Sequence, residues 1–216
     1  MKKLRKDYVF IFILLIIFVL LTAFVLQGKM DIVDEIFFKG VIKIENKPLT
    51  SVLRIITDFA STIGIITLLV VTGLIFLKHK ALSDFKYVVI NVFSGVVLVT
   101  ILKNVVGRIR PAWKWIEQGG FSYPSGHTIS AFMLYGTLML LVYKKVHGKL
   151  RKPLLIGFSL VIFLTGFSRI YFGAHYLTDV LASLILGCII LIISNMFMNK
   201  EFNNDKNKNR KAVQTK

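Results

Sequence analysis

The chain is poor in cysteine and in acidic residues, and each shortage narrows what the protein can be. Its single cysteine, Cys188, cannot form an intrachain disulfide, and its place within an apolar run predicts a buried side chain. Asp and Glu number 11 against 28 Lys and Arg, which gives a formal net charge of +17. A charge of this size suits either nucleic acid or an anionic membrane surface, so its distribution along the chain has to decide between them.

Long hydrophobic runs are what the chain has in abundance. Hydrophobic residues make up 55% of it and the mean hydropathy is +0.70, which are values of a membrane protein. A transmembrane helix needs about 20 predominantly apolar residues. Such stretches recur six times, near residues 8–26, 52–77, 87–106, 128–143, 153–172 and 177–198. The sequence therefore predicts an all-α integral membrane protein, with one six-span domain over residues 1–199.

Most of the basic residues fall on one side of this predicted bundle. They lie in residues 2–6, in the loops 78–86 and 144–152, and in the segment 200–216, for which we expect a disordered tail. The positive-inside rule places these segments and both termini in the cytoplasm. A nucleic-acid-binding protein would carry its cations on one soluble surface, so we expect no nucleic-acid partner. A cleaved signal peptide is the rival interpretation of the first run, but the run is long and lacks a small-x-small site after it.

Two features precede the polar motifs. In residues 27–49 the apolar residues follow helical spacing, with acidic residues early and lysines late, which favours an amphipathic helix in the outer interface over a plain loop. Such a helix would form a lip beside the site.

Arg54 and Asp58 are four residues apart, which predicts an ion pair on one helix face.

Three short polar segments interrupt the hydrophobic second half, all on the predicted extracytoplasmic side. Polar groups beside lipid are costly and therefore indicate function. In the last segment His175 and Asp179 are spaced i,i+4, so both side chains share a helix face. A carboxylate that holds one imidazole nitrogen leaves the other free as a base or a nucleophile. Alone, such a pair is weak evidence, because most pairs of this kind are simply satisfied polar contacts.

The first segment supplies fixed positive charge. Lys103 and Arg110 are seven residues apart, two turns on one helix face if the helix persists, and Gly107 and Pro111 indicate that it ends there. Arg169 adds a third cation, and guanidinium groups match phosphate oxygens in bidentate geometry. The competing explanation is that basic side chains near helix ends reach for lipid headgroups, and we assign Arg108 to it.

The middle segment, Pro124-Ser-Gly-His127, precedes the fourth run. Ser125 and Gly126 can present backbone amides to an anion at a helix N-terminus, and His127 could donate a proton to a leaving oxygen. An ordinary N-cap turn with a polar histidine is the alternative. Before it, residues 112–123 contain four aromatic residues, which suit an interfacial belt or the entrance for a headgroup: Trp113, Trp115, Phe121 and Tyr123.

Taken in order, the three segments read K-x6-RP, PSGH and SR-x5-H-x3-D. This resembles the three-part signature of the type 2 phosphatidic acid phosphatase family, membrane relatives of the vanadium haloperoxidases. Every signature position is filled: Lys103, Arg110, Pro111, Pro124, Ser125, Gly126, His127, Ser168, Arg169, His175 and Asp179. The resemblance extends to a compact bacterial six-span layout, whereas the first 100 residues match in hydropathy alone.

The resemblance implies roles for these residues. His175 would attack phosphorus and form a phosphohistidine, Asp179 would orient it, and His127 would protonate the leaving alkoxide. The remaining residues would hold the nonbridging oxygens: Lys103, Arg110, Arg169, Ser125 and Gly126. It also implies a lipid-phosphate phosphatase of the bacterial cell membrane whose site faces outside. Its substrate would be phosphatidylglycerophosphate, phosphatidic acid or undecaprenyl diphosphate, and the motifs do not separate these.

We expect no cofactor and no metal, because His79 and His147 fall on the other side and few carboxylates accompany His127 and His175. Two other functions stay open. A phosphotransferase would use the same phosphohistidine and pass the group to a lipid or sugar acceptor. A transporter would carry its charges near the bilayer midplane on broken helices, whereas these lie at outer helix ends. Nothing in the sequence indicates an oligomeric state.

Overall fold

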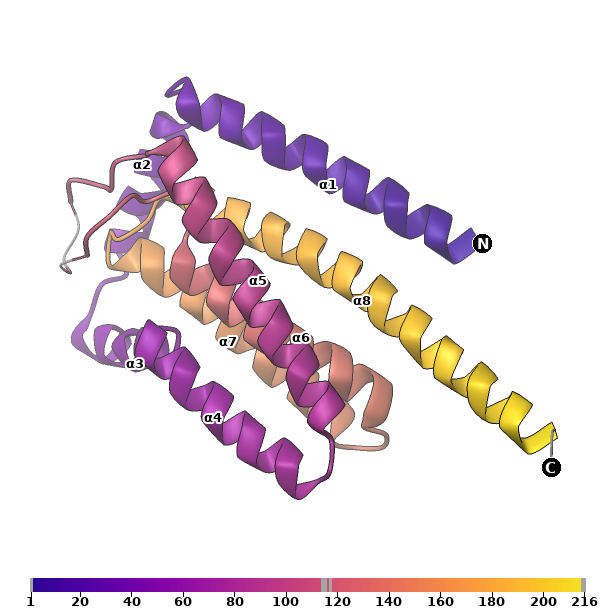
Figure 1. Ribbon diagram of the computed structural model, residues 1–216. Coiled ribbons are helices and arrows are strands. Elements are labelled where there is room, and N and C mark those ends of the chain that lie inside the picture. The colour runs from indigo at the N-terminus through magenta and orange to yellow at the C-terminus, as the bar shows by residue number, and fades with distance from the viewer. Residues whose placement is uncertain (1, 114–115, 117, 215–216) are drawn as a thin grey trace.

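The computed structural model describes residues 2–113, 116 and 118–214, and the regular elements in this part of the chain are all helices, with no strand (Figure 1). The helices are α1 (Lys2–Leu26), α2 (Asp31–Ile42), α3 (Lys47–Phe59), α4 (Thr62–Lys78), α5 (Leu82–Val106), α6 (Gly126–Lys145), α7 (Arg151–Tyr171) and α8 (Leu177–Gln214). Within the described residues, α1, α5, α6, α7 and α8 are each long and apolar enough to cross a membrane. The prediction of an all-α membrane protein is confirmed.

The predicted second span, near 52–77, is not one straight helix. It corresponds to α3 and α4, which are bent by 62° at a short break and make a sixth span only if the pair is counted as one. Ser61 causes the break because its hydroxyl caps α4 at Gly64 and also donates to the Asp58 carbonyl. A Cβ at Gly64 would lie 2.2 Å from that carbonyl oxygen, so only glycine allows this approach. Hydropathy cannot detect such a bend because both halves are apolar.

The predicted segment 27–49 does contain a helix, α2, over Asp31–Ile42. One face of α2 is buried, with Asp34, Phe38 and Val41 each at most 6% exposed. The predicted helix is therefore confirmed, but of the apolar residues that predicted it only Val41 is buried, whereas Val33 and Ile36 are 44% and 65% exposed. The buried face also includes a carboxylate that the sequence pattern assigned to the helix dipole.

Helix α6 lies at the centre of the bundle and packs against α5, α7 and α8. Ile129 and Met133 of α6 pack with Val92 of α5 in a core cluster of apolar side chains. The helices approach closely at glycines: a Cβ at Gly95 would lie 2.5 Å from the Met133 side chain, and one at Gly187 would lie 2.4 Å from Phe132. Small residues at contacts let membrane helices pack backbone to backbone.

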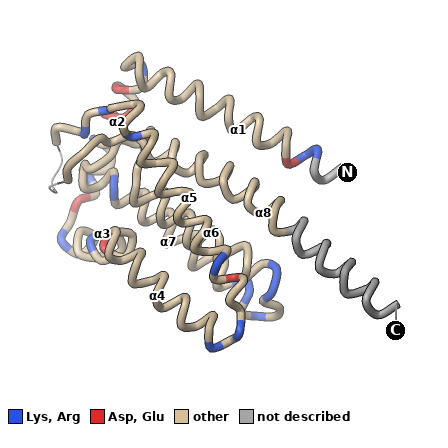
Figure 2. Tube along the Cα trace, viewed as in Figure 1, with Lys and Arg blue, Asp and Glu red and all other residues tan. Residues whose placement is uncertain are grey.

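Both termini lie at one end of the bundle, and the connections that carry the three polar motifs lie at the other (Figure 1). Lys and Arg gather at the first of these ends, around the α4–α5 and α6–α7 loops (Figure 2). Helix α8 continues to Gln214, because no glycine or proline follows Gly187 to end it. The segment 200–216, for which the sequence predicts a disordered tail, is therefore helical as far as Gln214. Only the part of α8 up to Met198 is apolar enough to span.

Candidate active site

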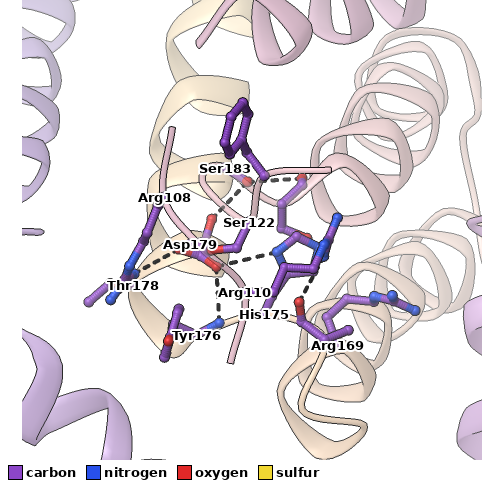
Figure 3. A network of polar contacts seen from close by, with 12 residues as sticks. Arg108, Arg110, Ser122, Arg169, His175, Tyr176, Thr178, Asp179 and Ser183 are labelled. Atoms are coloured by element: carbon purple, nitrogen blue, oxygen red, sulfur yellow. Dashed lines mark hydrogen bonds and ion pairs between the residues drawn. The ribbon is translucent and has the colours of Figure 1, made fainter. Parts of the chain in front are cut away.

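The three polar motifs meet at one end of the bundle, where α5 and α7 end and α6 and α8 begin (Figure 3). Helix α5 ends at Val106 because Gly107 takes the left-handed conformation, with φ of 63°. This ending turns the next residues across the top of the bundle. All eight predicted site residues lie in this region: Lys103, Arg110, Ser125, Gly126, His127, Arg169, His175 and Asp179.

His175 is 1% exposed, and its two ring nitrogens have different partners (Figure 3). Nδ1 lies 3.3 Å from Oδ2 of Asp179, and Nε2 lies 3.1 Å from Nη1 of Arg110. A guanidinium can only donate, so Nε2 must accept, and the proton must be on Nδ1, where it is donated to the carboxylate. The neighbours thus select a neutral tautomer whose lone pair is on Nε2, on the side of Arg110.

The arginines around this lone pair are held by neutral oxygens. Arg110 donates to the carbonyls of Gly119, Gly120 and Ala174, at 3.2, 3.0 and 2.8 Å. Arg169 is 1% exposed and donates to Thr57 at 2.7 Å and to the Gln118 side chain. Because these partners are uncharged, neither arginine is neutralised by them.

Arg169 also keeps one donor unused, since its Nε is buried without a hydrogen-bond partner among the described residues. A buried, unpaired N–H costs free energy unless a ligand accepts from it. Lys103, whose ammonium donates to the carbonyls of Phe121 and Ser122, is within electrostatic reach of Arg110 and Arg169. Three cations therefore converge where the sequence predicts phosphate binding.

The predicted helix N-terminus is present at α6. Ser125 is its N-cap, fully buried, and accepts hydrogen bonds from the amide and the hydroxyl of Thr128. The Ser125 hydroxyl is therefore engaged in capping α6. Gly126 faces Lys103, since a Cβ there would lie 3.9 Å from Cε of that lysine. His127 lines a cavity of about 320 Å³ together with Arg169, Gln118 and Phe172.

Arg108, which the sequence analysis assigned to lipid headgroups, is instead a central member of the site (Figure 3). Its Nη1 donates to Asp179 Oδ1 and to Thr178, at 2.8 and 2.7 Å, and its Nη2 donates to Asp34 Oδ2 at 2.8 Å. Its guanidinium carbon also lies 3.8 Å from the centre of the Tyr176 ring. The snorkelling assignment is wrong because two buried carboxylates draw the side chain inward.

Asp34 is the second residue that sequence reasoning missed. It is 1% exposed and accepts from the backbone amide and the hydroxyl of Thr178, at 2.9 and 2.7 Å, as well as from Arg108. The chain Asp34–Arg108–Asp179–His175 thus connects α2 to the imidazole. Burial would lower the pKa of Arg108, but Asp179 and Asp34 outweigh burial and raise it.

Other expectations near the site have mixed outcomes. Arg54 and Asp58 do not form the predicted ion pair in the described part of the chain. Both line the cavity of His127 instead. Trp113 stacks on Phe38 of α2, and Trp115 lies outside the described residues. Among described residues, no cluster of three or more His, Cys, Asp and Glu side chains could hold a metal ion.

A pH prediction follows from the burial of His175. Burial lowers the pKa of His175 to about 4; contact with Asp179 opposes the shift, and Arg169 and Arg110 reinforce it. Ring-nitrogen NMR shifts should therefore report a neutral Nδ1–H imidazole down to about pH 5. A His175 imidazole that becomes protonated near the unperturbed histidine value of about 6.5 would contradict the tautomer assigned above.

The lowered pKa of His175 also determines the direction in which this group makes stability depend on pH. The unfolded chain binds a proton near pH 6.5 and the folded chain only near pH 4. Between these values the unfolded state binds more protons, so this group lowers stability as the pH falls through that window. Above about pH 6.5 it has no such effect.

Comparison with known proteins agrees with the geometry. Residues 85–203 match the model of the PAP2 superfamily, which covers more than half of the chain. The chain belongs to the PAP2 superfamily. It is 26% identical over 190 residues to phosphatidylglycerophosphatase B of Bacillus subtilis, covering 87% of this chain and 94% of the relative. It is 31% identical over 153 residues to an undecaprenyl-diphosphatase of the same organism, covering 67% of this chain and 72% of that relative.

The fold is shared with a solved PAP2 structure. The crystal structure of a transmembrane PAP2-type phosphatidylglycerolphosphate phosphatase from Bacillus subtilis superimposes with a TM-score of 0.81 at 25% identity. The match covers 88% of this chain and 96% of that one. With the apolar helices, this makes the chain a multi-pass membrane protein of the PAP2 superfamily.

Proposed function

We propose that this protein is an integral membrane lipid-phosphate phosphatase that works through a phosphohistidine on His175. The observation that carries the proposal is the Nε2 lone pair of His175, presented beside Arg110 while Nδ1 is held by Asp179. A neutral imidazole with a fixed tautomer and converging cations is the equipment for nucleophilic attack on a phosphate ester. PAP2 membership and the names of two relatives, phosphatidylglycerophosphatase B and undecaprenyl-diphosphatase, support the same reaction class.

In the first step Nε2 of His175 attacks phosphorus, and the bond from phosphorus to the lipid oxygen breaks. His127 donates its proton to that leaving oxygen, and it lines the cavity beside Arg169. Charge that develops on the nonbridging oxygens is stabilised by Lys103, Arg110 and Arg169, together with the backbone amide of Gly126. The unpaired Nε of Arg169 is one donor ready for this purpose. Asp179 keeps the proton of His175 on Nδ1 throughout.

In the second step water attacks the phosphohistidine and the nitrogen–phosphorus bond breaks. His127 has by then lost its proton to the leaving group, so it can accept one from the water. Inorganic phosphate leaves and the starting protonation states are restored. No metal or cofactor takes part in this scheme, because the arginines, the lysine and the helix amides provide the positive potential.

For the substrate we propose phosphatidylglycerophosphate first, with phosphatidic acid and undecaprenyl diphosphate as the other candidates. The phosphatidylglycerophosphatase B relative is matched over almost its whole length, and the diphosphatase relative over less of it. The cavity lined by His127 also contains Arg54, Asp58 and Gln118, polar side chains that suit the hydroxyl groups of a glycerol leaving group. We further propose that this end of the bundle faces outside and that both termini are cytoplasmic.

The test is phosphate release by the purified protein from three lipids presented in the same detergent: phosphatidylglycerophosphate, phosphatidic acid and undecaprenyl diphosphate. We expect release from phosphatidylglycerophosphate to be fastest and to persist in excess chelator. Lipid or sugar acceptors are added in parallel arms. Phosphoryl transfer to an acceptor in place of phosphate release would establish a phosphotransferase, and loss of activity with chelator would overturn the metal-free scheme.

A further inference from the structure

A second cavity lies between α5, α6 and α8 at the end of the bundle opposite His175. It has a volume of about 960 Å³, at the upper end of the range of small-molecule sites, about 300–1,000 Å³. Its residues come from the start of α5, the end of α6 and the later part of α8, whereas the catalytic motifs occupy the other end of each helix. Asp84 and Lys103 lie about 28 Å apart along α5, at 1.5 Å per residue.

The wall of this cavity contains two polar groups without partners. The Tyr87 hydroxyl and Nδ2 of Asn91 are buried and have no hydrogen-bond partner in the described part of the chain. Each such group destabilises the fold when it is left unsatisfied. Both can donate, so a ligand with acceptor oxygens would satisfy them after small side-chain rotations. Two unsatisfied donors on one wall indicate that the cavity is built for more than apolar packing.

The mouth of the cavity is basic and its flank is apolar. Lys144 donates to the Asn195 amide oxygen at 2.7 Å, and Lys145 pairs with Asp84. These lysines belong to the end of the bundle where Lys and Arg gather (Figure 2). On the flank Ile90, Ile193 and Phe197 are 61%, 39% and 66% exposed, although they line the same cavity. The cavity thus has positive charge at its rim, unpaired hydrogen-bond donors inside and exposed apolar side chains on its flank. This combination fits an amphiphile with an anionic headgroup.

We propose that this cavity binds one anionic phospholipid from the leaflet at that end of the bundle. Its phosphate would lie at Lys144 and Lys145, its glycerol and ester oxygens would accept from Tyr87 and Asn91, and its acyl chains would lie along Ile90, Ile193 and Phe197. This site is separate from the catalytic one in position and in residues, so it does not depend on the proposed function. It makes the protein a specific binder of anionic lipid as well as a phosphatase.

The experiment is native mass spectrometry of the purified, full-length protein with phosphatidylglycerol or phosphatidylcholine of identical acyl chains. We expect one tightly retained phosphatidylglycerol per protein and at least tenfold weaker retention of phosphatidylcholine. Lys144→Ala should remove most of this preference. The matched control is Lys86→Ala, which deletes the same charge from the same end but from an exposed position outside the cavity. Ser94→Phe, which fills the cavity without changing charge, should abolish retention of both lipids.

Several results would overturn the proposal. Equal retention of the two lipids by the unaltered protein would remove the specificity. An equal loss with Lys86→Ala and Lys144→Ala would mean general surface attraction. A dimer that Ser94→Phe dissociates would show that a second copy covers the cavity. Hydrolysis of a short-chain, water-soluble phosphate monoester reports on folding, and we expect it to be unchanged in all three variants because none of them contacts the catalytic residues.

Discussion

Replacing His175 with alanine should lower phosphate release by at least about 10⁴-fold, because the variant loses the atom that we propose as the nucleophile. His175 is the residue whose Nε2 lone pair is oriented by Arg110 and whose Nδ1 proton is held by Asp179. The measurement is phosphate release from phosphatidylglycerophosphate by the purified variant. His147→Ala is the matched control, since this histidine is exposed at the opposite end, and it should retain full activity.

The covalent intermediate can be tested in the same experiment. His127→Ala keeps the nucleophile but lacks the proposed acid and base, so it should be slowed by about 10²–10⁴-fold. Slow breakdown should then allow labelled phosphate to be trapped on His175 and located by mass spectrometry. Full activity in His175→Ala, or label on another residue, would contradict the mechanism.

Replacing Asp34 with asparagine should reduce both stability and turnover, although α2 carries none of the catalytic residues. The carboxylate is buried and holds Arg108 and Thr178, and Arg108 in turn holds Asp179. Removing one partner of a buried ion pair typically costs about 3–5 kcal/mol. A small displacement of Asp179 and His175 should lower kcat by roughly 100-fold, whereas KM should change little because the phosphate-binding cations are untouched.

Asp31→Asn is the matched control for this prediction. Asp31 approaches the same guanidinium at 3.4 Å, but its side chain is 67% exposed. An exposed pair contributes about 0–1 kcal/mol, so this variant should stay close to the unaltered protein in thermal unfolding and in kcat. Wild-type kcat in Asp34→Asn would show that the link from α2 to His175 carries no function, and equal effects of the two variants would show that burial is irrelevant.

The sequence predicted which motif residues meet at the site better than it predicted what holds them in place. Of the six spans expected from hydropathy, five are single helices and the second is a bent pair, and the order of the three motifs identified residues that meet at one end. Arg108 was missed because its partners Asp34, Thr178 and Asp179 lie 74, 70 and 71 residues away. An arginine at the end of an apolar run has the same local sequence whether it reaches lipid or a buried carboxylate. Acidic residues in the first turn of an amphipathic helix likewise fit two explanations, a favourable interaction with the helix dipole and a buried contact.

The bend between α3 and α4 was beyond prediction for a related reason. It depends on the Ser61 cap and on the absence of a side chain at Gly64, both of which are compatible with a continuous helix. Arg54 and Asp58 keep the predicted spacing within α3, but both line the cavity of His127 in place of pairing with each other. Residue spacing can thus predict correctly that two side chains share a helix face and still not predict what those side chains contact.

The first 84 residues lie before the segment that matches the superfamily model, yet several of their side chains reach toward the site. Thr22 of α1 is hydrogen-bonded to Tyr123 beside the middle motif, Asp34 of α2 holds Arg108, and Thr57 of α3 accepts from Arg169. The residues that we propose as nucleophile, acid and phosphate-binding cations all come from the other part. A relative that exchanged its first three helices but kept a carboxylate in the place of Asp34 could therefore acquire a new headgroup preference and inherit the same reaction.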